Sequence, residues 1–298
     1  MQKYGLPYKG SKNKLVDRFM EIFPERENFY DLFCGGCAVS HGALLSKKYK
    51  NIFINDIQSD IPQLFLDAMR GKYKYEKRWI SREDFFLLKD SDPFVKVCWS
   101  FGNDLRTYLY GRDIEEYKKF LHYAVVFRDY EPLKEKYNID LSEIDSLPDK
   151  YARKRKAREI LKSGPVLANL ESLERLQNLE RLAGDIKSYA MNYDEVPIKK
   201  DSLLYCDIPY RSTNGYDKKG RTVKTLDYEN FYQWCRKQQE LVIISEYQMP
   251  SDFICIAEFE KRVTLGDNNA KIQMEKLFIP EHQKDMFGAI NQQGELFL

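Results

Sequence analysis

The feature that most constrains the fold of this chain is the alternation of apolar strands and amphipathic helices near its N-terminus. Residues 28–33 (NFYDLF) and 51–56 (NIFIND) have the short apolar runs of buried strands, and residues 38–49 and 60–70 have helical patterns. Strands that alternate with helices form a parallel sheet with helices packed on its faces. The sequence therefore predicts an α/β fold for this part of the chain.

The alternation is interrupted and later resumes. Residues 72–194 carry long helical patterns with few strand signals, and one stretch has leucines at 167, 170, 173, 176, 179 and 182, as on the buried face of a helix. Strands are predicted again at 202–208 and 241–247, with a helix at 227–240 between them and a closing pair at 253–261 and 275–280. We expect residues 1–71 and 195–298 to form one catalytic domain that is interrupted by a helical insertion at 72–194.

Composition excludes some classes of protein without identifying a partner. Lys and Arg total 48 against 46 Asp and Glu, so the net charge of +2 says little about ligands. No apolar segment approaches the roughly 18–20 residues that span a bilayer, and the start lacks the apolar run of a signal peptide, so we expect a cytoplasmic protein. The six cysteines are scattered, which favours reduced thiols, and Cys34 and Cys37 form a lone CxxC without a second pair for zinc.

The first strand leads through glycines into a helix. Gly35 and Gly36 stand in the turn, where glycine lets the backbone approach a ligand closely. Asp56 ends the next strand about twenty residues later, where a nucleotide-binding unit places a carboxylate for the ribose hydroxyls. The spacing is not GxGxxG, so a mononucleoside such as S-adenosylmethionine is favoured over a dinucleotide. Alternatively, Asp56 caps a helix that begins near Ser59.

Residues 203–210 (LLYCDIPY) place an acid at the end of an apolar strand and follow it with a stiff turn. Asp207 faces the crevice where α/β sheets bind ligands. Pro209 restricts the backbone so that the carbonyl of Ile208 can be aimed into the site. The carboxylate and this carbonyl could accept both hydrogens of an exocyclic amine while the ring of Tyr210 stacks on the base. The alternative is an ordinary turn with an exposed aspartate.

Three motifs in this order resemble those of the Dam-like (alpha-group) DNA adenine methyltransferases: residues 7–15 (PYKGSKNKL), 31–36 (DLFCGG) and 207–210 (DIPY). The resemblance implies a Rossmann-like sheet with a helical insertion for target recognition. It also implies methyl transfer from S-adenosylmethionine to the amino group of a flipped adenine in double-stranded DNA, in a bacterium or phage. The implied cofactor-binding residues are Tyr8, Lys12, Asp31, Phe33, Gly35, Gly36, Asp56 and Asp207; the implied catalytic residues are Asp207, Ile208, Pro209 and Tyr210.

The chain departs from the family pattern at three positions. Ser11 and Cys37 stand where glycines are usual, and Ile208 replaces the first proline of the catalytic motif. Ser11 and Cys37 are small, and Ile208 contributes its backbone carbonyl, so we expect an active enzyme. Two alternatives stay open: a weak or inactive relative that binds DNA, and a methyltransferase that acts on RNA or on cytosine.

DNA contact is expected from local clusters of positive charge, which neutralise phosphates. Basic runs occur at residues 72–78 (KYKYEKR), at 150–162 and in the loop 211–224. Each run could instead be a solvated surface. The candidate DNA-binding residues are Arg211, Lys218, Lys219, Arg221, Lys224, Arg153 and Arg155.

The C-terminal residues NQQGELFL resemble the peptide by which bacterial proteins dock on the replication sliding clamp. Gln293, Leu296 and Phe297 would be the anchors. The alternative is a tail that packs on its own domain.

Overall fold

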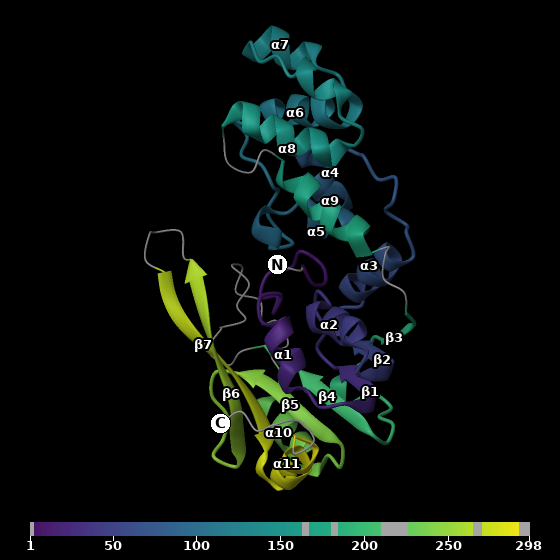
Figure 1. Ribbon diagram of the computed structural model, residues 1–298, viewed down its shortest axis with the longest axis vertical. Helices are drawn as coiled ribbons and strands as arrows, with labels where there is room; N and C mark the ends of the chain where they lie inside the picture. The colour runs from purple at the N-terminus through teal and green to yellow at the C-terminus, as the bar shows by residue number, and fades with distance from the viewer. Residues whose placement is uncertain (1–2, 163–166, 180–183, 210–225, 265–269, 292–298) are drawn as a thin grey trace. The chain divides into compact units, whose positions relative to one another are not determined.

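The computed structural model describes residues 3–162, 167–179, 184–209, 226–264 and 270–291 (Figure 1). Contacts divide the chain into two compact units. The sheet unit comprises Met1–Gly5, Lys12–Pro62 and Gly184–Leu298, and the helical unit comprises Leu6–Ser11 and Gln63–Ala183. Each unit is described by itself below.

The sheet unit contains a seven-stranded sheet with the order β3-β2-β1-β4-β5-β7-β6. Strands β1 to β5 are parallel, and β7 lies antiparallel between β5 and β6. The mixed α/β fold predicted from the sequence is confirmed, as are the two closing strands. The strands are β1 (Arg26–Asp31), β2 (Tyr49–Asn55), β3 (Ile186–Tyr189), β4 (Ser202–Cys206), β5 (Leu241–Glu246), β6 (Phe253–Thr264) and β7 (Ala270–Pro280).

The order of the strands determines where a ligand can bind. From β1 the chain proceeds to β2 and β3 on one side, and β4 then pairs with β1 on its other side. Such a reversal opens a crevice at the carboxyl ends of the strands, because the connecting loops diverge there. Asp31 ends β1 and Asp207 follows β4, so both acids lie at this crevice.

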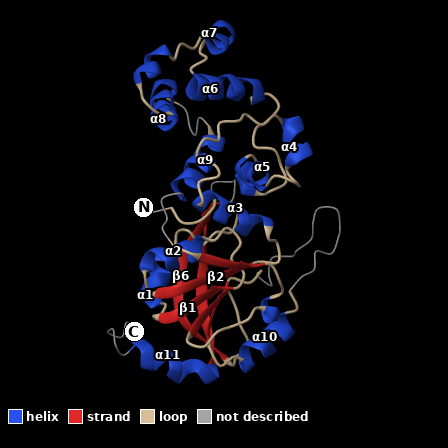
Figure 2. Cartoon of the chain, turned by 90° about the vertical axis from the view of Figure 1, so that its right-hand side faces the viewer, coloured by secondary structure: helices blue, strands red, loops and turns tan. Residues whose placement is uncertain are grey.

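Alternate residues of the strands face opposite helical layers. Tyr30 and Leu204 belong to the same buried cluster as Phe231 of α10 (Tyr228–Lys237). The neighbouring strand residue Tyr205 instead has its ring 6.0 Å from that of Phe19 in α1 (Val16–Ile22). Figure 2 shows α1 and α2 (Ala38–Ser46) on one side of the strands and α10 on the other. Since side chains alternate along a strand, both faces of β1 and β4 are apolar.

The helical unit is built from short helices joined by loops. Helix α6 packs against α7 and α8, and α5 packs against α4 and α9. Leu167, Leu170, Leu173, Leu176 and Leu179 are all buried, which confirms the predicted leucine stripe, while Leu182 lies outside the described residues. The helices are α3 (Asp60–Met69), which enters from the sheet unit, α4 (Arg82–Leu88), α5 (Pro93–Cys98), α6 (Glu115–Phe127), α7 (Glu131–Tyr137), α8 (Lys150–Leu161) and α9 (Ala168–Leu179); α11 (Lys284–Asn291) follows β7 in the sheet unit.

Within the described ranges, no helix is long and apolar enough to cross a bilayer. All six cysteines are free, and five of them are buried. Burial raises the pKa of both the Cys34 and the Cys37 thiol. Among the residues that the structure describes, no group of three His, Cys, Asp or Glu side chains is placed to hold a metal ion.

Asn55 at the end of β2 generates a prediction about stability. Its buried amide donates to the carbonyls of Leu32 and Met191, both at 3.1 Å, and accepts from the Met191 N–H at 3.2 Å. Asn55→Ala leaves these backbone groups without their partner, so we expect the free energy of unfolding in urea to fall by about 1–3 kcal/mol. Lys50→Ala on the same strand is the control, because its exposed ion pair with Glu27 contributes little. Equal losses in the two variants would contradict this role of Asn55.

Candidate active site

The turn after β1 has left-handed backbone at two positions. Gly35 has φ 44° and Cys37 has φ 56°. The Cys37 N–H donates to the Cys34 carbonyl at 2.7 Å and closes the turn. Cys37, one of the departures from the family pattern, therefore takes a conformation that glycine adopts more easily, at a cost of roughly 1–2 kcal/mol.

The N-terminal segment lies directly against this turn. A Cβ atom added to Gly5 would be 2.3 Å from the carbonyl oxygen of Gly36, so only glycine fits there. The Gly5 N–H donates to Nδ1 of His41 in α2 at 2.9 Å. The glycine turn is thus covered by backbone from the start of the chain.

Asp56 joins the loops that follow β1 and β2. Its carboxylate accepts from the N–H groups of Gly35 and Gln58, both at 2.9 Å. Helix α3 begins only at Asp60, so the alternative interpretation of Asp56 as a cap of that helix is wrong. Burial raises the pKa of Asp56, although these hydrogen bonds act to lower it.

Asp31 is the last residue of β1 and is almost completely buried. Its Oδ2 accepts from the hydroxyl of Ser40 at 2.5 Å, whereas Oδ1 has no hydrogen-bond partner among the described residues. Burial raises the pKa of Asp31 to about 7, and the charges of Asp207 and Asp56 contribute to this rise. A buried oxygen without a partner marks a place where a ligand could donate a hydrogen bond.

Asp207 is held by a buried cation. Its Oδ1 lies 2.7 Å from Nζ of Lys12, which is also 3.5 Å from Oε1 of Glu275. Lys12 and Glu275 are almost fully buried, while 24% of the Asp207 side chain is exposed. Burial acts to lower the pKa of Lys12, but the charges of Asp207 and Glu275 outweigh it, so the pKa of Lys12 lies above its ordinary value. The ammonium group therefore stays charged beside the proposed catalytic acid.

Glu275 on β7 was missed by the sequence analysis. A signal was present, because Glu275 and the fully buried Leu277 are two residues apart on one strand and so share a face. A charged residue on a buried strand face needs a partner. Which partner it has depends on the pairing of β7 with β5, which sequence patterns do not specify.

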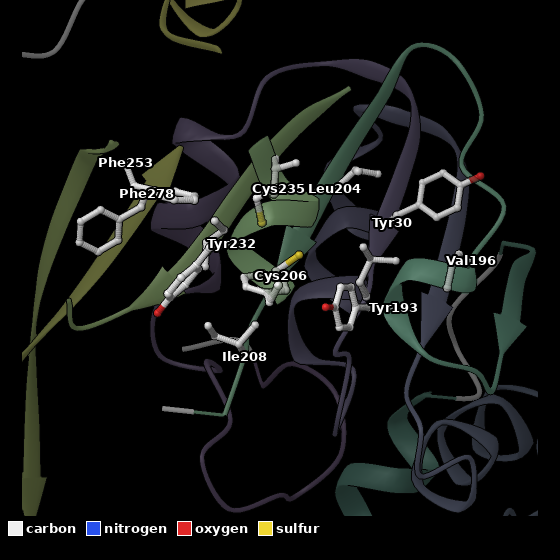
Figure 3. Packing of buried hydrophobic residues seen from close by; sticks show 14 of the residues in the cluster. Tyr30, Tyr193, Val196, Leu204, Cys206, Ile208, Tyr232, Cys235, Phe253 and Phe278 are labelled. Carbon is white, nitrogen blue, oxygen red and sulfur yellow. The ribbon is translucent and has the colours of Figure 1, made fainter. Parts of the chain in front are cut away.

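The turn after Asp207 is anchored in the core. Ile208 is 1% exposed and belongs to the cluster that includes Cys206 and Tyr232 (Figure 3). The hydroxyl of Tyr228 in α10 donates to the carbonyl of Pro209 at 2.6 Å. Ile208 therefore stabilises the turn by burying its side chain where the family usually has proline.

Phe33 and Tyr8, two further predicted cofactor residues, belong to different units of the chain. The ring of Phe33 stacks on Tyr193 at 5.5 Å, in the sheet unit. Tyr8 lies in Leu6–Ser11, which groups with the helical unit, so its place beside the other cofactor residues stays a prediction. The predicted residues outside the described ranges are Tyr210, Arg211, Lys218, Lys219, Arg221, Lys224, Gln293, Leu296 and Phe297.

The two candidate arginines of α8 have different environments. Arg153 is buried, and its guanidinium donates to the carbonyls of Val125 at 2.7 Å and Leu147 at 3.1 Å. The guanidinium is therefore bound to backbone carbonyls inside the helical unit, and the structure contradicts the prediction that Arg153 contacts DNA phosphates. The side chain of Arg155 is 62% exposed and lies 3.7 Å from Glu174, so it stays a candidate.

The parallel sheet with an antiparallel β7, the glycine turn after β1 and the acid after β4 define a Rossmann-like methyltransferase. The family model of the D12 class N6 adenine-specific DNA methyltransferases matches residues 8–238. This match covers more than half of the chain, which therefore belongs to that family. The protein is an adenine-specific DNA methyltransferase: DNA is its substrate, and a methyl donor is its cofactor.

The buried ion pairs of Lys12 generate a second prediction about stability. Glu275→Gln keeps the shape of the side chain but removes its charge, so we expect the free energy of unfolding in urea to fall by about 1–3 kcal/mol. Glu258→Gln on the neighbouring β6 is a matched control, because Glu258 also pairs with a lysine, Lys276 at 2.6 Å, but its side chain is 47% exposed. We expect no measurable loss for that control. Equal losses of unfolding free energy in Glu275→Gln and Glu258→Gln would show that burial does not determine how much Glu275 contributes to stability.

Proposed function

We propose that S-adenosylmethionine is the methyl donor and that Asp207 and the carbonyl of Ile208 hold the amino group of a flipped adenine. The observation that supports this most is the buried Lys12, which fixes Asp207 at the carboxyl end of β4. Asp31 and Asp56 lie at the ends of the adjacent strands, where a cofactor would bind.

The chemistry of the crevice fits S-adenosylmethionine. Asp31, Asp56 and Asp207 supply three carboxyl groups there against the one ammonium of Lys12, which favours a cationic ligand. The partnerless Oδ1 of Asp31 could accept a hydrogen bond from such a ligand. Asp56 uses two of about four acceptor positions on backbone N–H groups, which leaves others for ribose hydroxyls. The proposed cofactor-binding residues are Tyr8, Lys12, Asp31, Phe33, Gly35, Gly36, Asp56 and Asp207.

The proposed catalytic role of the chain is to orient the adenine nitrogen. The target base must leave the duplex at a cost of a few kcal/mol, and stacking on Tyr210 offsets about 1–3 kcal/mol of it. Asp207 and the Ile208 carbonyl accept the two hydrogens of the amine and hold its lone pair in line for transfer. When bound, S-adenosylmethionine supplies the methyl group as an electrophilic carbon on a sulfonium.

Glu275 is proposed as a positioning residue. It acts through Lys12, whose ammonium it contacts from the side of β7. With both carboxylates present, Lys12 keeps its charge in a buried place and holds Oδ1 of Asp207. Glu275 thereby helps to keep the Asp207 carboxylate in the position from which it would accept from the substrate amine.

Further roles rest on the sequence. We propose that the helical unit recognises the target sequence and that Arg155 and the loop residues Arg211, Lys218, Lys219, Arg221 and Lys224 contact DNA phosphates. The anchors for a replication sliding clamp would be Gln293, Leu296 and Phe297.

Asp207→Ala tests the catalytic assignment. We expect transfer of a labelled methyl group to DNA to be abolished, because the amine loses its charged acceptor, while binding of S-adenosylmethionine is weakened but still measurable by calorimetry. Asp194→Ala, at an exposed acid, should leave both properties unchanged. Nucleoside analysis of the methylated product should give N6-methyladenine in DNA. Full activity of Asp207→Ala, or product in RNA or on cytosine, would overturn the proposal.

The raised pKa of Asp31, at about 7, predicts pH-dependent binding of the cofactor. A cationic ligand favours the ionised carboxylate, so binding below pH 7 must first remove a proton. Affinity for S-adenosylmethionine should therefore rise about tenfold from pH 6 to pH 8. In Asp31→Asn this tenfold rise in affinity should be absent. The amino group of S-adenosylmethionine titrates in the same way with either protein, so it does not contribute to the difference between them. The same pH dependence in Asp31→Asn and in the parent protein would exclude Asp31 as its source.

A further inference from the structure

The segment 73–80 of the helical unit, between α3 and α4, is irregular in structure but fixed in place. Gln177 of α9 donates to two of its carbonyls, those of Tyr73 and Lys74, at 2.5 and 2.8 Å. Lys150 of α8 donates to the carbonyl of Glu76 at 2.8 Å. Side chains from two separate helices, α8 and α9, therefore hold this backbone in place through hydrogen bonds.

His122 of α6 provides a third support. Its Nε2 lies 3.0 Å from the carbonyl of Lys77, and its Nδ1 lies 3.0 Å from the side-chain amide of Asn169. The hydroxyl of Tyr110 completes the chain by donating to Asn169 at 2.7 Å. Burial lowers the pKa of His122 to about 4, so the ring is neutral and donates through only one nitrogen. The side chains of Tyr110, Asn169 and His122 thus form a continuous series of hydrogen bonds that ends at the Lys77 carbonyl.

The outer side of the segment is basic and aromatic. Tyr75 is 80% exposed, and Phe127 at the end of α6 is 49% exposed. Both line an open hollow of roughly 500 Å³. The full lining is Lys72, Tyr75, Glu76, Lys77, Arg78 and Phe127.

The guanidinium of Arg78 is fixed within this hollow. Glu76 accepts from the backbone N–H groups of Lys77 and Arg78, both at 2.8 Å, and from Nε of Arg78 at 2.9 Å. Arg78 also lies 3.3 Å from Asp92 and remains 49% exposed. The acid therefore orients the arginine without covering it.

We propose that this hollow, defined by Lys72, Tyr75, Lys77, Arg78 and Phe127, is a surface of the helical unit that binds the DNA substrate. The cations contact phosphates, and the exposed ring of Tyr75 stacks on an unpaired base. Aromatic rings between cations are the combination that binds unpaired nucleic acid without regard to sequence. A backbone fixed before binding also lowers the entropic cost of ordering the surface.

The inference rests on the proposed function only in taking DNA as the ligand, and it is tested by binding. We would measure the Kd of fluorescently labelled duplex and of a duplex with one unpaired base, by anisotropy at several salt concentrations. Tyr75→Ala should raise Kd about tenfold or more for the DNA with the unpaired base, and Tyr75→Phe should bind like the parent. Lys77→Ala should reduce the salt dependence by about one phosphate contact.

The controls match these variants in exposure. Phe86→Ala removes an aromatic side chain that is 52% exposed on α4, and Lys50→Ala removes a lysine that is 77% exposed at the amino end of β2. Both should bind DNA within about twofold of the parent protein. Melting temperature and binding of S-adenosylmethionine, unchanged in all variants, show that each remains folded.

Unchanged DNA binding in Tyr75→Ala and Lys77→Ala would overturn this inference while leaving methyl transfer by the parent protein intact. Equal losses in Tyr75→Ala and Tyr75→Phe would overturn the stacking role. The parent protein could also bind DNA but transfer no methyl group. In that case, weaker DNA binding in Tyr75→Ala and Lys77→Ala would support this inference, and the absence of methyl transfer would contradict the catalytic proposal.

Discussion

The proposed active site depends on one buried ammonium group. Lys12 is almost fully buried, a position that is unfavourable for a charge unless carboxylates compensate for the lost water. Asp207, which follows β4, and Glu275, in the middle of β7, do so. Lys12 follows the N-terminal segment whose Gly5 lies against the glycine turn. One ion-pair network therefore connects Lys12 near the start of the chain to Asp207 and Glu275, which lie far along the sequence beside β4 and within β7.

The sheet topology explains why so many acids lie together. Asp31, Asp56 and Asp207 follow or end three adjacent parallel strands, so their side chains converge at the same edge of the sheet. Their mutual repulsion contributes to the raised pKa of Asp31 and is relieved in part by Lys12. A cationic methyl donor would relieve it further. If the cofactor is S-adenosylmethionine, as proposed, the carboxylates that repel one another in the crevice would also attract the cationic cofactor.

Much of the fold could be predicted because its signals are local. The βα alternation and the leucine stripe of α9 can be read from residues close in sequence, and the turn at Asp207 has its own motif. Glu275 could not be assigned a role, because its partner Lys12 is brought to it only by the pairing of β7 with β5. Arg153 was misjudged because a basic helix does not reveal which of its faces is buried against other helices. Both cases turn on tertiary contacts between distant segments.

The central claim is tested most directly by a crystal structure of the protein with target DNA and an unreactive analogue of S-adenosylmethionine. We predict that the amino nitrogen of an extruded adenine lies within hydrogen-bond distance of Asp207 and of the Ile208 carbonyl, with Lys12 still paired to Asp207 and Glu275. An Asp207 side chain turned away from the base, or a Lys12 separated from both carboxylates, would contradict the account.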